Sequence, residues 1–128
     1  MKNREKTIFE LRPELELEVE HASEVEKFQN ITLRPILKYQ NDLFVNVFSK
    51  YIEKRKNKFY GMDVSDKHQF IEQSIKQDVK FKNLMIGIVI GLFSLDELEF
   101  YQTHETELNR RITTMLVQRL KSMLDQFN

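Results

Sequence analysis

Apolar residues recur at spacings of three and four along residues 32–56. On an α-helix this spacing collects the apolar side chains into one broad stripe. Thr32 stands where a capping hydroxyl is expected, and Pro35 falls in the first turn, where its missing N–H costs nothing. The pattern therefore predicts one helix from Thr32 to Lys56, with an apolar face made of Leu33, Ile36, Leu37, Leu43, Phe44, Val47, Phe48, Tyr51 and Ile52.

Further helices are indicated by serines and by the same periodicity. Ser23 and Ser94 each precede a glutamate by three residues, which is the spacing of a capping box, and they predict helices over about 23–30 and 94–103. Ser65 is the expected cap of another helix, and a periodic apolar pattern predicts one more from near Glu105 almost to the C-terminus.

Residues 80–93 are apolar on nearly every side. A helix without a polar face is buried all round, so this segment is expected to be the central helix. Asp78 is its expected cap. Because the run is short and rich in β-branched residues, a buried strand is the alternative.

The first 22 residues differ from the rest of the chain. Between Glu10 and Glu26 there are seven glutamates and one arginine, and residues 15–20 alternate between apolar and acidic side chains. Alternation is typical of a strand, but no second strand is evident to pair with it. We therefore expect residues 1–22 to form an extended or flexible acidic arm, and residues 23–128 to form one helical domain. The arm docks either on its own helices or on a second chain.

Composition supports the same fold class. The chain has 128 residues with three glycines, two prolines and 31% charged residues, which favours helices joined by short links. We expect an all-α fold, a compact and partly orthogonal bundle of five to six helices with an extended acidic N-terminal arm.

The charge balance and the lengths of the apolar runs limit the classes of partner that we expect the chain to bind. Twenty basic residues balance twenty acidic ones, whereas a nucleic-acid binder normally carries a basic excess. The N-terminus is charged, and the longest apolar run, residues 84–93, is about half of what a membrane-spanning helix needs. The chain has no cysteine, which excludes disulfide bonds and thiolate chemistry. We expect a cytoplasmic protein that does not enter a membrane.

Motifs for catalysis or metal binding are weak. His68 with Glu72, and His104 with Glu107, have the spacing of two ligands on one helix face. Glutamate is abundant in the chain, so His–Glu pairs at helical spacing arise by chance, and no nucleophile or phosphate-loop motif is present. We predict no catalytic residue, no metal and no cofactor.

Two candidate surfaces follow from the predicted helices. Arg34, Asn41, Arg110 and Arg111 are expected to line a polar crevice between the helices that start near Thr32 and Glu105, where they either bind a ligand or hold the two helices together by hydrogen bonds. The second surface is a homodimer interface in which the acidic arm lies on a neighbour's basic helix end. Its expected residues are Leu15, Leu17, Val19, Lys54, Arg55, Lys56 and Lys58.

Parts of the chain resemble a small bacterial family of uncharacterised helical proteins. The resemblance rests on residues 28–44, which read FQNITLRPILKYQNDLF, and on residues 90–93 and 108–111. It covers roughly residues 24–126 and implies an all-α domain, without carrying over any functional residue. Some members are labelled glyoxalase, but the strands and the His and Glu metal ligands of that enzyme fold have no counterpart here.

These observations favour a non-enzymatic protein-interaction or scaffold module. A small-molecule binder or enzyme that uses the polar crevice is the alternative. A nucleic-acid-associated protein is the second alternative, since the charge is locally basic near Lys54.

Overall fold

The computed structural model describes residues 3–13, 22–55 and 58–127. Its α-helices are α1 (Arg4–Leu11), α2 (Glu24–Phe28), α3 (Arg34–Tyr39), α4 (Asn41–Glu53), α5 (Val64–Gln77), α6 (Val79–Ile90), α7 (Leu95–Thr103) and α8 (Glu105–Ser122). A π-helical turn, η1, covers Gln29–Leu33, and 3-10 turns cover Phe59–Gly61 and Leu124–Gln126. No strand occurs in these three ranges, so the predicted all-α bundle is confirmed and the strand alternative for residues 80–93 is wrong.

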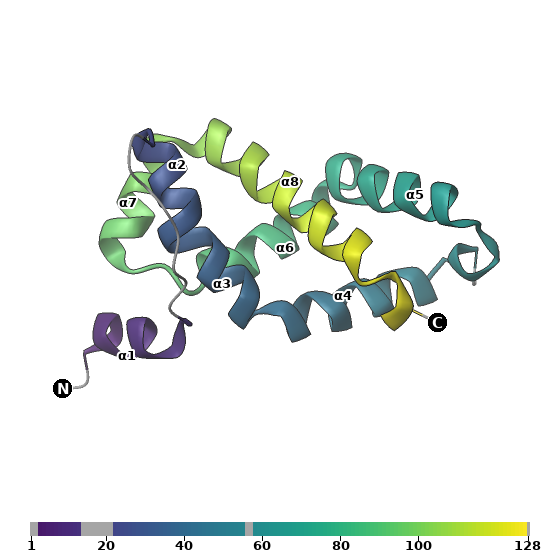
Figure 1. The fold of residues 1–128 in the computed structure, drawn as a ribbon, viewed down its shortest axis with the longest axis horizontal. Helices are drawn as coiled ribbons and strands as arrows, with labels where there is room; N and C mark the ends of the chain where they lie inside the picture. The colour runs from purple at the N-terminus through teal and green to yellow at the C-terminus, as the bar shows by residue number, and fades with distance from the viewer. Residues whose placement is uncertain (1–2, 14–21, 56–57, 128) are drawn as a thin grey trace.

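The helices form an elongated bundle (Figure 1). Helix α8 runs diagonally along the long axis, and α5 and α6 pack against it and against each other. Helices α2, α3 and α4 follow one another along the other side of α8, while α1 lies at the outer edge of the bundle near α7.

The chain is helical without a break from Glu24 to Tyr39, which differs from the prediction that a new helix begins at Thr32. Pro35 lacks an N–H, and its ring would crowd the carbonyl four residues earlier in a regular α-helix. The wider π turn over Gln29–Leu33 accommodates it, with the Arg34 N–H bonded to the Gln29 carbonyl. Thr32 is therefore a buried helix-interior residue rather than a cap.

Side-chain caps mark the other helix starts. The hydroxyl of Ser23 accepts from the Glu26 N–H, and Ser94 forms a complete capping box with Glu97, as predicted. Asp78 caps α6, also as predicted. Helix α5 begins earlier than predicted, because Asp63 rather than Ser65 accepts the first free backbone N–H.

The core is continuous and rich in phenylalanine. Phe48 is fully buried and its ring meets those of Tyr51, Phe59, Phe70, Phe81 and Phe127. Helix α6 contributes Phe81, Met85, Ile86 and Val89 to this core. It is not buried on all sides, however, since Val79 and Leu84 are 67% and 52% exposed. The prediction of a helix buried on all sides is therefore wrong.

Part of the predicted extended arm is helical. Asn3 caps α1, and Ile8 of α1 is buried. The alternating residues 15–20 lie outside the described residues.

Candidate functional site

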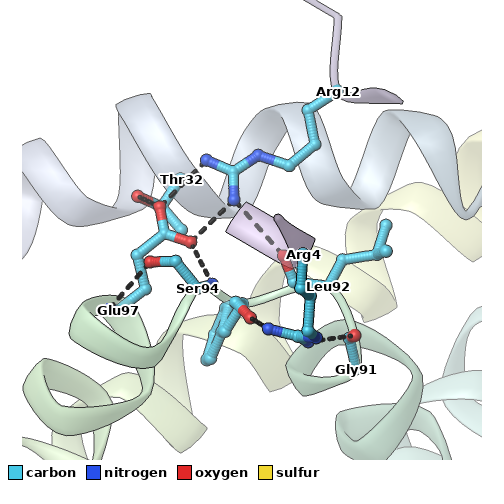
Figure 2. A network of polar contacts seen from close by, with 8 residues as sticks. Arg4, Arg12, Thr32, Gly91, Leu92, Ser94 and Glu97 are labelled. Atoms are coloured by element: carbon cyan, nitrogen blue, oxygen red, sulfur yellow. Dashed lines mark hydrogen bonds and ion pairs between the residues drawn. The ribbon is translucent and has the colours of Figure 1, made fainter. Parts of the chain in front are cut away.

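A buried ion pair fastens α1 to the bundle (Figure 2). The guanidinium of Arg12 donates to both carboxylate oxygens of Glu97, at 2.7 and 2.9 Å, and also to the Leu92 carbonyl. The Thr32 hydroxyl and the Ser94 N–H donate to the same carboxylate at 3.0 and 2.9 Å. We call Arg12, Thr32, Ser94 and Glu97 the N-terminal clasp.

The clasp is complete without a ligand. Burial alone would raise the pKa of the Glu97 carboxyl, but the hydrogen bonds from Arg12, Ser94 and Thr32 outweigh burial and hold that pKa below its usual value. Each carboxylate oxygen already accepts two hydrogen bonds. Nearby, Arg4 donates to the carbonyls of Phe93 and Gly91. These contacts join α1 to the α6–α7 turn and serve the fold.

Three of the four residues of the predicted crevice are hydrogen-bonded to other side chains of the bundle. Arg34 donates to Asn30, and Arg111 donates to Gln29 and Glu107. Asn41 accepts from Arg119 at 3.1 Å. Three of these contacts pair a guanidinium with a neutral amide, and the Arg111–Gln29 and Arg119–Asn41 contacts join α8 to η1 and to the start of α4.

Arg119 belongs to the same contact zone and was not anticipated from the sequence. Burial, and then the positive charge of nearby Arg34, lowers the pKa of its guanidinium. Arg110 is different, because it lies on another face of α8.

Of the basic residues of the predicted dimer interface, three are described: Lys54, Arg55 and Lys58. Lys54 and Lys58 are exposed, and Lys56, Leu15, Leu17 and Val19 lie outside the described residues. The Arg55 guanidinium lies 3.4 Å from the ring centre of Tyr51 and donates to Asp78 at 3.1 Å. Arg55 therefore links α4 to the start of α6 within its own chain.

An open hollow of about 570 Å³ lies between the end of α5, the first turns of α6 and one face of α8. We call it the basic hollow, and its lining residues are Lys76, Lys82, Thr106, Asn109, Arg110, Thr113 and Thr114. Those from α8 recur at intervals of three and four, so they share one helix face. Its volume falls in the range of about 300–1,000 Å³ that is typical of small-molecule sites.

The charges of the basic hollow are positive and largely uncompensated. Among the described residues that line it, none is acidic. Lys76 has one carboxylate within ion-pair range, that of Glu72 at 3.9 Å, and Glu72 is closer to Lys121, at 3.4 Å. Within the described ranges, Lys82 and Arg110 form no ion pair. A positive potential in a concave site attracts anions.

Thr113 is the buried polar residue of this site. It is 6% exposed, and its hydroxyl oxygen has no hydrogen-bond partner among the described residues. A buried hydroxyl without a partner is costly and uncommon in native proteins, so it calls for an explanation. Beside it, the carbonyl oxygen of Asn109 accepts from the Tyr101 hydroxyl, and no described residue accepts a hydrogen bond from its two N–H donors.

A second hollow, of about 460 Å³, lies between the start of α1 and the α6–α7 turn. Its lining includes Arg4, whose guanidinium is already bonded to two carbonyls, together with Ile90, Phe93, Leu95 and Leu98. It offers fewer unused polar groups than the basic hollow.

The basic hollow was only partly visible in the sequence. Arg110 belonged to the predicted ligand-binding set, but Lys76, Lys82 and Thr113 did not. The available signal was the polar face of α8, where Thr106, Asn109 and Thr113 recur at helical spacing; this pattern is also typical of an ordinary solvent-facing helix surface.

Two further features concern metals and membranes. The described residues contain no group of three or more His, Asp or Glu side chains placed to hold a metal ion. His104 stacks on the ring of Phe100, and its Nδ1 lies 3.0 Å from the Phe100 carbonyl. In the same described ranges, none of the helices has the length and apolar character needed to span a bilayer.

Neither a protein-family model, nor a curated protein, nor a solved structure matches this chain, and the resemblance drawn from residues 28–44 and 108–111 stays a prediction.

Proposed function

We propose that this chain is a non-enzymatic binding module whose basic hollow holds a small anionic molecule. The observation that carries the proposal is the convergence of three cationic side chains, Lys76, Lys82 and Arg110, on one hollow whose described lining residues include no acidic one. This is the small-molecule alternative of the sequence, moved from the crevice near Arg34 to another face of α8.

The chemistry of the lining supports binding of an anion. Lys76, Lys82 and Arg110 supply positive charge from three different helices, and Asn109 supplies amide N–H donors. Hydrogen bonds from charged donors to phosphate or carboxylate oxygens are about twice as strong as neutral ones. An anion that enters the hollow relieves the mutual repulsion of these cations.

The site is built on rigid elements. Thr113 and Asn109 lie on α8, which packs against α5, α6 and α7. Because the donors sit on packed helices rather than on loops, little ordering entropy is lost when a ligand binds. The protein-interaction role and the homodimer expected from the sequence are separate proposals, which this site does not require.

Isothermal titration with sodium phosphate tests the proposal. The wild-type protein is compared with Arg110→Gln and Lys82→Gln, which remove one charge each from the hollow. Lys38→Gln is the matched control, since Lys38 is an exposed lysine on α3. We expect millimolar or tighter binding that weakens with added salt, is reduced by both hollow variants and is unchanged by the control. An absence of binding, or an equal effect of all three variants, would contradict the proposal.

A further inference from the structure

We infer that the outer faces of α4 and α6 form a docking surface for an amphipathic, acidic helix of a partner protein. This surface is independent of the basic hollow. Lys82 lines the hollow, whereas Leu84 belongs to the docking surface, and two positions along an α-helix are about 200° apart around its axis. The inference gives a location and a kind of partner to the protein-interaction role that the sequence favours.

Helices α4 and α6 run side by side in opposite directions (Figure 1). Just before α4, the Gln40 side chain donates to the Ile88 carbonyl, near the end of α6, at 3.1 Å. Toward the other end of the pair, the ring of Tyr51 stacks on that of Phe81, with ring centres 3.9 Å apart. The residues between these two contacts therefore lie beside one another on the two helices.

Four apolar residues on these stretches share the outer side of the pair. Leu43 and Val47 are four positions apart, so they lie on one face of α4, and Leu84 and Ile88 do the same on α6. Leu43 and Leu84 are 49% and 52% exposed, while their two neighbours are partly buried against the core. We call these four residues the apolar strip. Its spacing suits the apolar face of another helix, whose own anchors recur every three or four positions.

Gly87 lies between Leu84 and Ile88 on α6 and leaves room for a close approach. It is exposed, and a Cβ added to it would meet no heavy atom within 4 Å. Because glycine destabilises a helix interior relative to alanine, the packing of the described residues gives no reason for a glycine here. A small residue where two helices cross lets their backbones come close. A bilayer surface gains only from added apolar area, so the missing side chain favours a helix as the occupant.

Lysines at one end of the strip indicate the charge of the partner. Lys50 and Lys54 continue the face of α4 that carries the strip, and Lys80 lies one turn before Leu84 on α6. Because the two helices are antiparallel, these lysines gather at the same end. Lys54 and Lys80 are exposed and form no ion pair within the described ranges, while Lys50 is paired with Glu53 at 3.6 Å. Helix α6 carries no acidic residue, so the α6 of a second copy offers these lysines no counter-charge, whereas an acidic helix does.

Fluorescence anisotropy with a labelled, designed peptide tests the inference. The probe has about 18 residues, which is long enough for a helix to form. It carries leucine at every third or fourth position, alanine at the centre of this apolar stripe and glutamates beside it. We expect the intact protein to bind it with a micromolar Kd that rises with added salt. A peptide of the same composition in scrambled order, or one with lysine in place of glutamate, is expected to bind at least about tenfold more weakly.

Variants then locate the binding on the strip. Leu84→Ala is expected to weaken peptide binding at least about tenfold, because it removes most of an apolar side chain. Val79→Ala is the control, since Val79 is 67% exposed on another face of α6. Gly87→Ala is expected to raise the urea midpoint of the free protein and yet weaken binding about tenfold, a combination that a purely structural glycine would not give. Lys80→Gln is expected to reduce the salt dependence of binding, whereas Lys38→Gln, on α3, is not. Far-UV circular dichroism verifies that each variant is folded.

Several results would overturn the inference. These are no peptide binding at up to about 1 mM, equal binding of the scrambled peptide, and equal losses in Leu84→Ala and Val79→Ala. A dimer in sedimentation of the protein alone, weakened by Leu84→Ala, would assign the strip to a second copy. Retention on phosphatidylserine vesicles that Leu84→Ala abolishes would assign it to a lipid surface. Phosphate binding at the basic hollow is measured separately and stands or fails on its own.

Discussion

Arg12 and Glu97 are 85 positions apart in the sequence, yet two guanidinium nitrogens of one meet both carboxylate oxygens of the other at 2.7 and 2.9 Å. Their side chains retain only 7% and 13% of their accessible surface. The pair joins α1 to the first turn of α7, where Glu97 also completes the capping box with Ser94. The Glu97 carboxylate therefore caps the start of α7, binds Arg12 at the end of α1 and accepts a hydrogen bond from the buried Thr32.

Replacing this carboxylate is expected to be costly. Glu97→Gln leaves the largely buried Arg12 without a counter-charge, and loss of one partner of a buried ion pair typically costs about 3 kcal/mol. Urea unfolding followed by circular dichroism measures the loss. Glu53→Gln is the control, because its pair with Lys50 is exposed, with side chains 56% and 68% accessible, and should matter by less than about 1 kcal/mol. Equal losses in the two variants would show that the clasp does not stabilise the fold.

Low pH is expected to lower the free energy of unfolding through Glu97 and Asp78. The folded state holds the pKa of Glu97 below the ordinary glutamate value of 4.5, and the Phe81 N–H and the Tyr51 hydroxyl likewise lower the pKa of Asp78. The unfolded chain therefore takes up protons first as the pH falls. The stabilisation is complete above the ordinary carboxyl pKa and is lost as the pH falls through the lowered values.

Urea midpoints between pH 7 and pH 3 test this pH dependence. The wild-type midpoint should fall steeply below about pH 4.5. Glu97→Gln should show a shallower fall, since one of the titrating groups is gone. A parallel fall in the two proteins would assign the acid sensitivity to other carboxylates.

Thr113 offers a test in the opposite direction, because removal of its hydroxyl should stabilise the ligand-free protein. Its buried hydroxyl has no partner among the described residues, and the desolvation of such a group costs about 1–3 kcal/mol. Thr113→Val is therefore expected to raise the free energy of unfolding by about 1 kcal/mol. Thermal unfolding without ligand is the measurement, with Thr103→Val as the control. A destabilised Thr113→Val protein would indicate that the hydroxyl has a partner within the fold.

Local sequence patterns predicted the helices better than they predicted the contacts between them. Period and capping located α8 and the start of α7, because both depend on residues within a few positions of one another. Thr32 has the identity of a cap, but its partner Glu97 is 65 positions away, and no local pattern reveals that contact. The basic hollow likewise requires the packing of α5, α6 and α8. The sequence predicted only Arg110 as a ligand-binding residue of that site.

Two neighbouring residues on α6 show where the burial predicted from the sequence differs from the burial in the structure. Leu84 and Met85 are both apolar and belong to the segment that the sequence predicted to be buried all round. Leu84 is 52% exposed, whereas Met85 is fully buried. Met85→Ala should leave a cavity and cost about 2–5 kcal/mol, whereas Leu84→Ala removes a partly hydrated side chain and should cost less than about 1 kcal/mol.

Urea unfolding of both alanine variants at several protein concentrations measures this contrast. A loss at Leu84 that matches the loss at Met85 would mean that Leu84 is covered in solution. If that loss grew with protein concentration, the cover would be a second copy of the chain, because association stabilises a folded protein in proportion to the logarithm of partner concentration. Sedimentation of the wild-type protein would then show a dimer that Leu84→Ala weakens, and the self-association expected from the sequence would be placed on α6 rather than on the acidic arm.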